Sequence, residues 1–197
     1  MKNAILFIIL TVGLLGCGAP RSELVSRTGF NLIGMTVISP NDPGWFAIKS
    51  NPGAVALGKS GAVQGESLIL SVSIIQVEGG RSDRSILEEA KSAKAVNDNP
   101  ARFQNVSFST REVTFNGARC IRFEGSSQNT RARIATASVV YENNVGYTCR
   151  HPLRRDVAVD FTVSSRSASS TLSTAERNLA ESFFNNIQFN ENYFDEL

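Results

Sequence analysis

The stretch ESLILSVSIIQVE, residues 66–78, decides the fold class, because its side chains alternate with the period of a β-strand. One face of this strand is almost entirely apolar and carries Leu68, Leu70, Val72, Ile74 and Gln76. The opposite face mixes serines with apolar residues. An apolar strand face packs against a core, so the stretch predicts a sheet that is covered on at least one side.

After Gly79-Gly80 the spacing of the apolar residues changes from that of a strand to that of a helix. We expect two helices in the chain, over residues 82–97 and 175–186. Each is assigned a Ser-x-x-Glu capping box, formed by Ser85 with Glu88 and by Ser173 with Glu176.

Turn signals divide the rest of the chain into short strands. Asn116-Gly117 is the strongest hairpin signal and joins strands expected over 105–115 and 118–125. Asn143-Asn144 predicts a second hairpin. The other expected strands cover residues 32–38, 45–49, 54–57, 133–142, 145–151 and 156–164, with a short strand segment at 188–189.

The order of strands, helix, strands and helix predicts a single α+β domain, an antiparallel sheet with two helices packed on it. The chain resembles the PsbP-like α/β sandwich over about residues 30–190. The segments that carry the resemblance are GWFAIKS (44–50), LEEAKSAKA (87–95), FNGARCIRFEG (115–125) and AERNLAESFFNNIQF (175–189). The resemblance implies a fold and no chemistry, because a fold does not determine a function.

The N-terminus carries an apolar run, residues 4–15, that is shorter than the roughly 20 residues needed to cross a membrane. It ends in Leu14-Leu15-Gly16-Cys17, which resembles a bacterial lipoprotein signal. The resemblance implies cleavage before Cys17 and acylation of that residue. The alternative is an ordinary secretory signal that is cleaved near Gly18-Ala19.

Under the lipoprotein interpretation, residues 1–16 are the signal peptide and 17–29 a lipidated tether. Residues 30–190 are then the domain, and 191–197 an acidic tail. The residue after Cys17 is Gly18 rather than Asp, which by the enterobacterial sorting pattern implies the outer membrane, facing the periplasm. In a bacterium with one membrane, the same signal would place the protein on the cell surface.

The charges of the chain nearly balance, with 20 Lys and Arg against 18 Asp and Glu. Because Lys2 would leave with the signal, the mature chain is closer still to neutral. We therefore expect no nucleic-acid partner. Apolar residues make up 42% of the chain, which is typical of a globular domain and argues against disorder.

Lipidation of Cys17 leaves one pair of cysteines, Cys120 and Cys149, in a compartment that permits disulfides. A bridge between them would close a loop of about 30 residues and contribute about 3.5 kcal/mol to stability. The expected strand over 133–142 conflicts with this bridge, because in a simple meander it would hold the two cysteines about 9.6 Å apart. A disulfide needs Cα atoms within about 7 Å, so either the meander is imperfect or the thiols stay free. We expect the disulfide.

An arginine-rich segment between residues 119 and 155 is the candidate anion-binding or partner-binding region. It has seven arginines and two glutamates. Guanidinium groups suit carboxylate and phosphate ligands, whereas solvated strand faces are the alternative interpretation. The seven are Arg119, Arg122, Arg131, Arg133, Arg150, Arg154 and Arg155.

Catalysis has little support in the sequence. His151 is the single histidine and the one candidate general base, and a strand-end structural role is the alternative. Two cysteines and one histidine fall short of a closed zinc shell, so we expect neither metal nor cofactor. Trp45 and Phe46 follow a turn-rich loop, where core packing is favoured over an exposed aromatic anchor.

The sequence thus favours a membrane-anchored envelope lipoprotein that binds a protein or an anionic ligand and does not catalyse a reaction. One specific alternative is an inhibitor or immunity lipoprotein against a periplasmic toxin or hydrolase. A second alternative is a small envelope hydrolase that uses His151.

Overall fold

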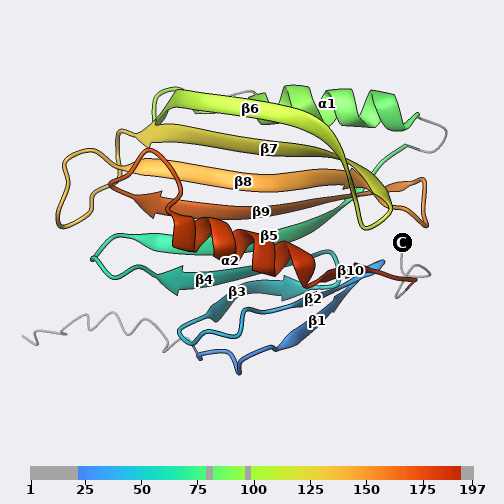
Figure 1. Ribbon diagram of the computed structural model, residues 1–197, viewed down its shortest axis with the longest axis horizontal. Coiled ribbons are helices and arrows are strands. Elements are labelled where there is room, and N and C mark those ends of the chain that lie inside the picture. Colours follow the sequence, from blue (N-terminus) through green and yellow to red (C-terminus); the bar gives the residue numbers. More distant parts are fainter. Residues whose placement is uncertain (1–21, 79–81, 96–98, 192–197) are drawn as a thin grey trace, which may run out of the picture.

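The computed structural model describes residues 22–78, 82–95 and 99–191, so the expected signal and Cys17 lie outside the described residues. The strands are β1 (Gly29–Leu32), β2 (Met35–Ile38), β3 (Phe46–Asn51), β4 (Ala54–Ser60), β5 (Ser67–Gln76), β6 (Phe103–Phe115), β7 (Ala118–Asn129), β8 (Tyr141–Arg150), β9 (Val157–Ser167) and β10 (Ile187–Phe189). The helices are α1 (Asp83–Ala95) and α2 (Thr174–Asn185) (Figure 1).

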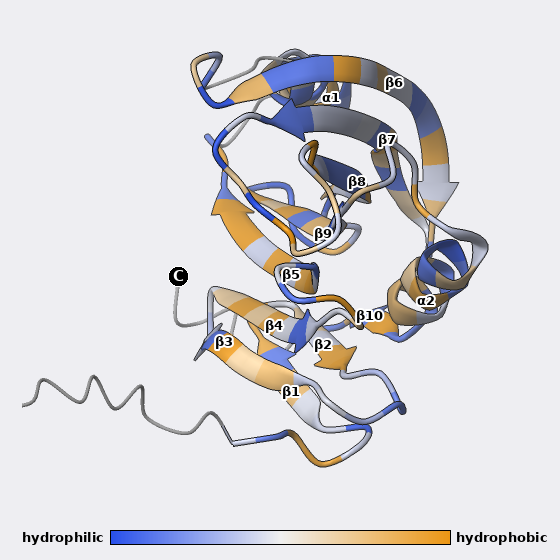
Figure 2. Ribbon diagram, turned by 90° about the vertical axis from the view of Figure 1, so that its left-hand side faces the viewer, coloured by the Kyte–Doolittle hydropathy of each residue, from blue (hydrophilic) through white to orange (hydrophobic). Residues whose placement is uncertain are grey.

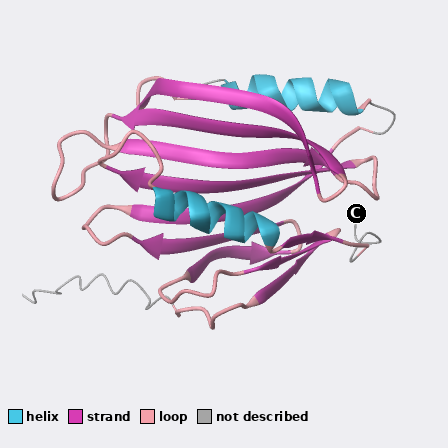
Figure 3. Cartoon of the chain, viewed as in Figure 1, coloured by secondary structure: helices cyan, strands magenta, loops and turns pink. Residues whose placement is uncertain are grey.

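Two antiparallel sheets and two helices form the domain (Figure 3). The large sheet has seven strands in the order β3-β4-β5-β9-β8-β7-β6, and the small sheet has the order β1-β2-β10. The expected α+β class with an antiparallel sheet and two helices is confirmed. The strand that decided the fold class, β5, lies between β4 and β9, with Leu70 and Val72 completely buried.

The two helices lie on opposite faces of the large sheet (Figure 2). Helix α2 and the small sheet cover one face, where Phe183, Phe184 and Ile187 join the main core. Helix α1 packs on the other face over β7 and β8, and buries Ile86 and Leu87 there. Both faces of the sheet are thus covered in part, but α1 covers only a portion of its face.

The capping pattern was right for one helix and wrong for the other. Ser173 and Glu176 form the predicted capping box of α2, each side chain bonding the backbone N–H of the other residue. At α1, the Oγ of Ser82 accepts a hydrogen bond from the backbone N–H of Ser85 at 3.2 Å. The cap therefore lies one turn earlier than the Ser85–Glu88 pair that we predicted.

The expected strand over 32–38 is in fact two strands. β1 and β2 form a hairpin in which Leu32 pairs with Met35. The chain reverses at Gly34, whose φ of 75° lies in the left-handed region that glycine tolerates. A continuous apolar run conceals this turn, because the residues on both sides of it, including Ile33, are buried.

The predicted hairpin at Asn143-Asn144 is wrong, and so is the strand expected over 133–142. β8 runs straight through both asparagines, which pair with β7 on one side and β9 on the other. The residues that precede β8 form a connection with an isolated bridge between Ile134 and Ala137. Two consecutive asparagines resemble a turn, but here neighbouring strands satisfy the backbone on both sides.

The segment expected to be a tether contacts the domain ahead of residue 30. Glu23 forms an isolated bridge with Phe46, and the backbone N–H of Leu24 donates to the carbonyl of Trp45. Trp45 itself is 1% exposed, so its predicted place in the core is confirmed. The N-terminal segment is therefore fastened to the β3 edge of the large sheet.

Candidate functional site

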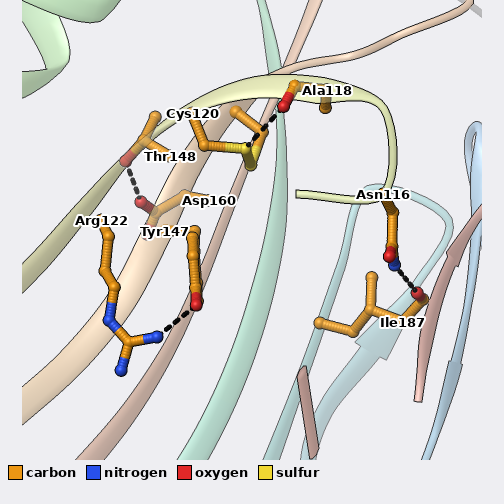
Figure 4. Close-up of a disulfide and its surroundings, with 9 residues drawn as sticks. Asn116, Ala118, Cys120, Arg122, Tyr147, Thr148, Asp160 and Ile187 are labelled. Atoms are coloured by element: carbon orange, nitrogen blue, oxygen red, sulfur yellow. Dashed lines mark hydrogen bonds between the residues drawn. A yellow bond between two sulfur atoms is a disulfide. The ribbon is translucent and has the colours of Figure 1, made fainter. Parts of the chain in front are cut away.

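No strand separates the two strands that carry Cys120 and Cys149, so the conflict between the expected topology and the disulfide is removed. Cys120 of β7 and Cys149 of β8 are direct cross-strand partners, with their Cα atoms 4.0 Å apart and their sulfur atoms bonded (Figure 4). So short a Cα distance is typical of a pair that exchanges no backbone hydrogen bonds. Both cysteines are fully buried in the main core, so this pair is structural.

The seven candidate arginines do not share one face. Arg131 and Arg133 lie in the connection before β8, whereas Arg154 and Arg155 lie in the turn after it, at the opposite end of that strand. The other three are distributed over both faces of the sheet: Arg122 beside α2, and Arg119 and Arg150 on the side of α1.

Several of these arginines are engaged in ion pairs within the fold. Arg122 forms an ion pair with Glu181 of α2. It also donates to the hydroxyl of Tyr147 (Figure 4). Arg154 pairs with Asp156, and its hydrogen bonds lower the pKa of that carboxyl group to about 2. Arg122 thus fastens β7 to α2, whereas the pair of Arg154 and Asp156 lies within the turn between β8 and β9.

Arg150 is buried rather than displayed. It is 4% exposed, and its three guanidinium nitrogens have no hydrogen-bond partner in the part of the chain that the structure describes. Its cross-strand neighbours are Ala158 of β9 and, one step beyond the disulfide, Arg119 of β7. The side chain is enclosed by the sheet, so it offers no open binding surface.

His151 is also held inside the fold. Its Nε2 lies 2.7 Å from the carbonyl oxygen of Gly34, and its Nδ1 accepts a hydrogen bond from the backbone N–H of Leu153 at 3.1 Å. Burial lowers its pKa below the usual 6.5. The neutral ring is therefore bonded at both nitrogens, and neither is presented to a substrate.

A hollow on the α1 face of the large sheet is the candidate site, which we call the polar groove. It lies over β6, β7, β8 and β9, beyond the last turn of α1, and has a volume of about 450 Å³. This volume falls in the range of small-molecule sites in proteins. The lining residues are Lys94, Asn99, Arg102, Phe103, Asn105, Ser107, Phe108, Phe123, Gly125, Ser126, Ser127, Glu142, Asn144, Thr162, Ser164 and Arg166.

Strand register arranges the floor of the polar groove in rows. One row runs across four strands, from β6 to β9, and consists of Phe108, Gly125, Asn144 and Ser164. The next row consists of Asn105, Ser127, Glu142 and Arg166. Strands lie about 4.8 Å apart, so a row of four residues spans about 14 Å.

Gly125 is the residue over which the side chains of Phe108 and Asn144 approach each other. A Cβ atom at this position would lie 3.2 Å from Cδ2 of Phe108 and 3.1 Å from Oδ1 of Asn144. Both distances are tighter than ordinary van der Waals contact, so a larger residue would displace the ring or the amide.

The cations of the polar groove differ in how they are neutralised. Nζ of Lys94 lies 2.8 Å from Asp160, and Nε of Arg166 lies 2.8 Å from Glu142. Arg102 has no carboxylate at ion-pair distance among the described residues, and its Nε is buried without a hydrogen-bond partner there. The polar groove therefore carries one guanidinium whose charge the described fold leaves unmatched.

Aromatic rings accompany these cations. The guanidinium carbon of Arg102 lies 4.9 Å from the ring centre of Phe103, and Nζ of Lys94 lies 4.4 Å from that of Phe123. Both distances suit cation–π contacts. Phe108 is 37% exposed and forms an open apolar surface at the β6 end of its row.

A second hollow lies on the other side of α1, between this helix and β5, with a volume of about 640 Å³. Its lining includes Ile75, Ala90 and Ala93 together with the acidic residues Glu78 and Glu89. It shares Lys94 with the polar groove, but it lacks the arginines and the asparagines that line that groove. The anion-binding chemistry expected from the sequence therefore fits the polar groove better.

Sequence reasoning missed the residues of the polar groove. Lys94, Arg102 and Arg166 all lie outside the arginine-rich segment, and none belongs to a recognisable motif. The hairpin signal Asn116-Gly117 predicted that β6 pairs with β7. That β8 and then β9 follow on the other side of β7 is known only from the strand order of the sheet.

The described residues contain neither a metal-binding cluster nor a membrane-spanning helix. Within residues 22–78, 82–95 and 99–191, no three His, Cys, Asp or Glu side chains are grouped closely enough to hold a metal ion. No helix in these ranges is both long and apolar enough to cross a membrane.

Comparisons with known proteins leave the function open. No family model matches the sequence, and no curated protein matches it. Among solved structures, the chain is similar to cyanobacterial PsbP (CyanoP) from Synechocystis sp. PCC 6803, at 12% sequence identity and a TM-score of 0.40. The match covers 90% of this chain and 98% of that one. At this TM-score the likeness carries no argument about ligands or partners.

Proposed function

We propose that this protein is a lipid-anchored envelope protein that binds an anionic ligand in the polar groove and does not act as an enzyme. The single observation that carries the ligand-binding part is the unmatched guanidinium of Arg102 in a hollow of about 450 Å³. Arg102 forms no ion pair within the described residues, and an anion in the groove would supply a countercharge to its guanidinium.

The location is argued from the sequence alone. The Leu14-Leu15-Gly16-Cys17 signal supports an acylated Cys17, and Gly18 supports the outer membrane, facing the periplasm. The cell surface is the corresponding location in a bacterium with one membrane. A protein held in the envelope meets ligands of that compartment, which include many acidic metabolites and polymers.

Binding is favoured over catalysis by the state of the side chains. The candidate base, His151, has hydrogen bonds at both nitrogens. In the polar groove, Glu142 accepts bonds from Arg166 and Asn129, so this carboxylate is positioned as an acceptor within the fold. The available groups are hydrogen-bond donors, amides and apolar rings, which recognise a ligand without transforming it.

The proposal is tested by the effect of anions on thermal stability. A ligand that binds only the folded state raises the melting temperature in proportion to the logarithm of its concentration. We expect an organic or inorganic anion from the set of acetate, phosphate and glucuronate to raise the melting temperature at constant ionic strength, with chloride as the reference. Arg102→Met should abolish this increase.

Arg111→Met is the matched control. Arg111 is an exposed arginine of the same strand, β6, and it does not line the polar groove. This variant should keep the full anion response. If no anion raises the melting temperature, or if both variants respond as the unchanged protein does, the proposed function is wrong.

A further inference from the structure

We infer that the polar groove binds a saccharide unit that bears a single carboxylate group. This inference rests on the proposed function and narrows the ligand class. It follows from three properties of the groove: one unmatched charge, a row of neutral polar groups, and an exposed aromatic ring at the end of that row.

The charge of the groove sets the charge of the ligand. Lys94 and Arg166 are each paired with a carboxylate of the fold, which leaves Arg102 as the one unmatched cation in the described lining. A guanidinium presents two parallel N–H donors that fit the two oxygens of one carboxylate. A ligand with several phosphates would bring more negative charge than this site can neutralise.

The neutral polar groups of the floor call for hydroxyl partners. The side chains of Asn144 and Ser164 make no hydrogen bond within the described parts of the chain, and they are cross-strand neighbours in the same row. An asparagine amide can donate and accept at once, and so can a serine hydroxyl. Adjacent hydroxyl groups on a sugar ring also donate and accept, so they match this pair in both roles.

The aromatic surface completes the match. Phe108 stands at the β6 end of the row, next to Gly125, and is 37% exposed. One face of a sugar ring consists of C–H groups, and these pack favourably against the face of an aromatic ring. A ligand that is apolar on one face and hydroxylated at its edges therefore fits the sequence Phe108, Gly125, Asn144 and Ser164 along the row.

The dimensions agree with this class of ligand. The row of four residues spans about 14 Å at the usual strand spacing, which accommodates one or two sugar rings. Arg102 precedes β6, next to the Asn105 row, at one end of the grid. The carboxylate is thus expected at that end, and the apolar face of the ring over Phe108.

The test compares ligands that differ in one group. Glucuronate and glucose differ in having a carboxylate or a hydroxymethyl group on the same ring, whereas acetate and phosphate are anions without a ring. The full chain is titrated with each in micelles of a polyoxyethylene detergent, which carries neither sugar nor charge. Backbone amide shifts of Gly125, Asn144 and Ser164 are followed by NMR, with Leu57 as a remote reference.

We expect glucuronate to shift the amides of the groove and to bind at least tenfold more tightly than glucose, as a charge-assisted hydrogen bond predicts. It should also bind more tightly than acetate or phosphate. Arg102→Met should reduce the affinity for glucuronate to that for glucose, whereas Arg111→Met should not change it. Gly125→Ala, which crowds Phe108 and Asn144, should weaken the binding of both sugars.

Two results would overturn the inference in distinguishable ways. If acetate or phosphate binds at least as tightly as glucuronate, and does so through Arg102, the saccharide assignment is wrong and the anion-binding function stands. If no anion shifts the groove amides in an Arg102-dependent manner, both proposals are wrong. A melting curve of each variant verifies that its fold is intact.

Discussion

His151 links the β8–β9 turn to the small sheet through its two ring nitrogens. The carbonyl of Gly34 accepts from Nε2–H, which fixes the neutral tautomer with a lone pair on Nδ1, and that lone pair accepts from Leu153. Protonation at Nδ1 would break the bond to Leu153. The ring is 2% exposed, so a positive charge would also lose its hydration.

Stability is therefore expected to fall as the pH drops below about 6.5. Because the pKa of His151 is lowered in the folded state, the unfolded chain binds more protons there than the native chain does. His151→Gln should be less stable than the unchanged protein near pH 7, but its stability should vary less between about pH 7 and pH 5. Urea unfolding at each pH measures this. If the free energy of unfolding depends on pH with the same slope in His151→Gln and in the unchanged protein, the prediction is wrong, because the chain has one histidine.

Arg150 poses a different problem, because its charge is buried without a hydrogen bond among the described residues. Burying a charged side chain costs more free energy than burying an apolar side chain of similar size. Replacing a buried charged residue with an apolar one is therefore often stabilising. We expect Arg150→Met to raise the free energy of unfolding by about 1–3 kcal/mol, as measured by urea denaturation. Arg119→Met, at an exposed position in the next strand, should change it by less than about 0.5 kcal/mol.

A loss of stability in Arg150→Met would contradict this expectation. It would show that the guanidinium is compensated in solution by a group that the described fold does not provide, such as a bound anion. Repeating the denaturation in sulfate and in chloride would then identify the anion by its selective effect on the unchanged protein.

Burial along single strands was predictable, but the place of the arginines was not. Alternation alone identified Leu70 and Val72 as core residues, because the period of a strand fixes which side chains share a face. Arg150 looked like a surface residue because charged side chains are rarely buried. Its burial depends on β7, β9 and the helix that covers this face, which no local pattern encodes.

At the scale of elements, the pairing of β7 with β8 is likewise a feature that local sequence patterns do not encode. The hairpin of β6 and β7 was predictable because Asn116 and Gly117 both take positive φ values, 46° and 80°, which this residue pair favours. The pairing of β7 with β8 was not predictable, because the connection before β8 has no regular sequence pattern. The disulfide was inferred correctly from compartment and cysteine count, although the expected topology opposed it.

Reduction of this disulfide should destabilise the domain by about 3.5 kcal/mol, since the loop it closes spans about 30 residues. Both sulfur atoms are buried, so the comparison is made by urea unfolding at equilibrium with and without a thiol reductant. The double variant Cys120→Ala/Cys149→Val should be insensitive to the reductant. If reductant leaves the unfolding midpoint of the unchanged protein in place, the bond is absent or contributes nothing.

At the scale of the whole molecule, the first described residues of the chain lie at the β3 edge of the large sheet, and the polar groove lies over its other half, from β9 to β6. β3 and β6 form the two edges of the large sheet (Figure 1). Glu23 and Leu24 are fastened to the β3 edge, whereas the groove extends to β6. Six strand spacings separate these edges, about 29 Å. Cys17 precedes Glu23 by six residues, a length that reaches about 20 Å at most. A lipid on Cys17 would therefore hold the β3 edge nearest the membrane.

This arrangement predicts that anchoring and ligand binding are separable. Cys17→Ser should move the protein from the membrane fraction to the soluble fraction, because it removes the residue that carries the proposed lipid anchor. The Arg102-dependent response to anions should be unchanged, since Arg102 directly precedes β6, which forms the edge of the large sheet opposite to β3. Fractionation and the anion melting assay on the same variant measure both effects. Continued association with membranes would refute the lipid anchor, and a lost anion response would show that the groove depends on the membrane surface.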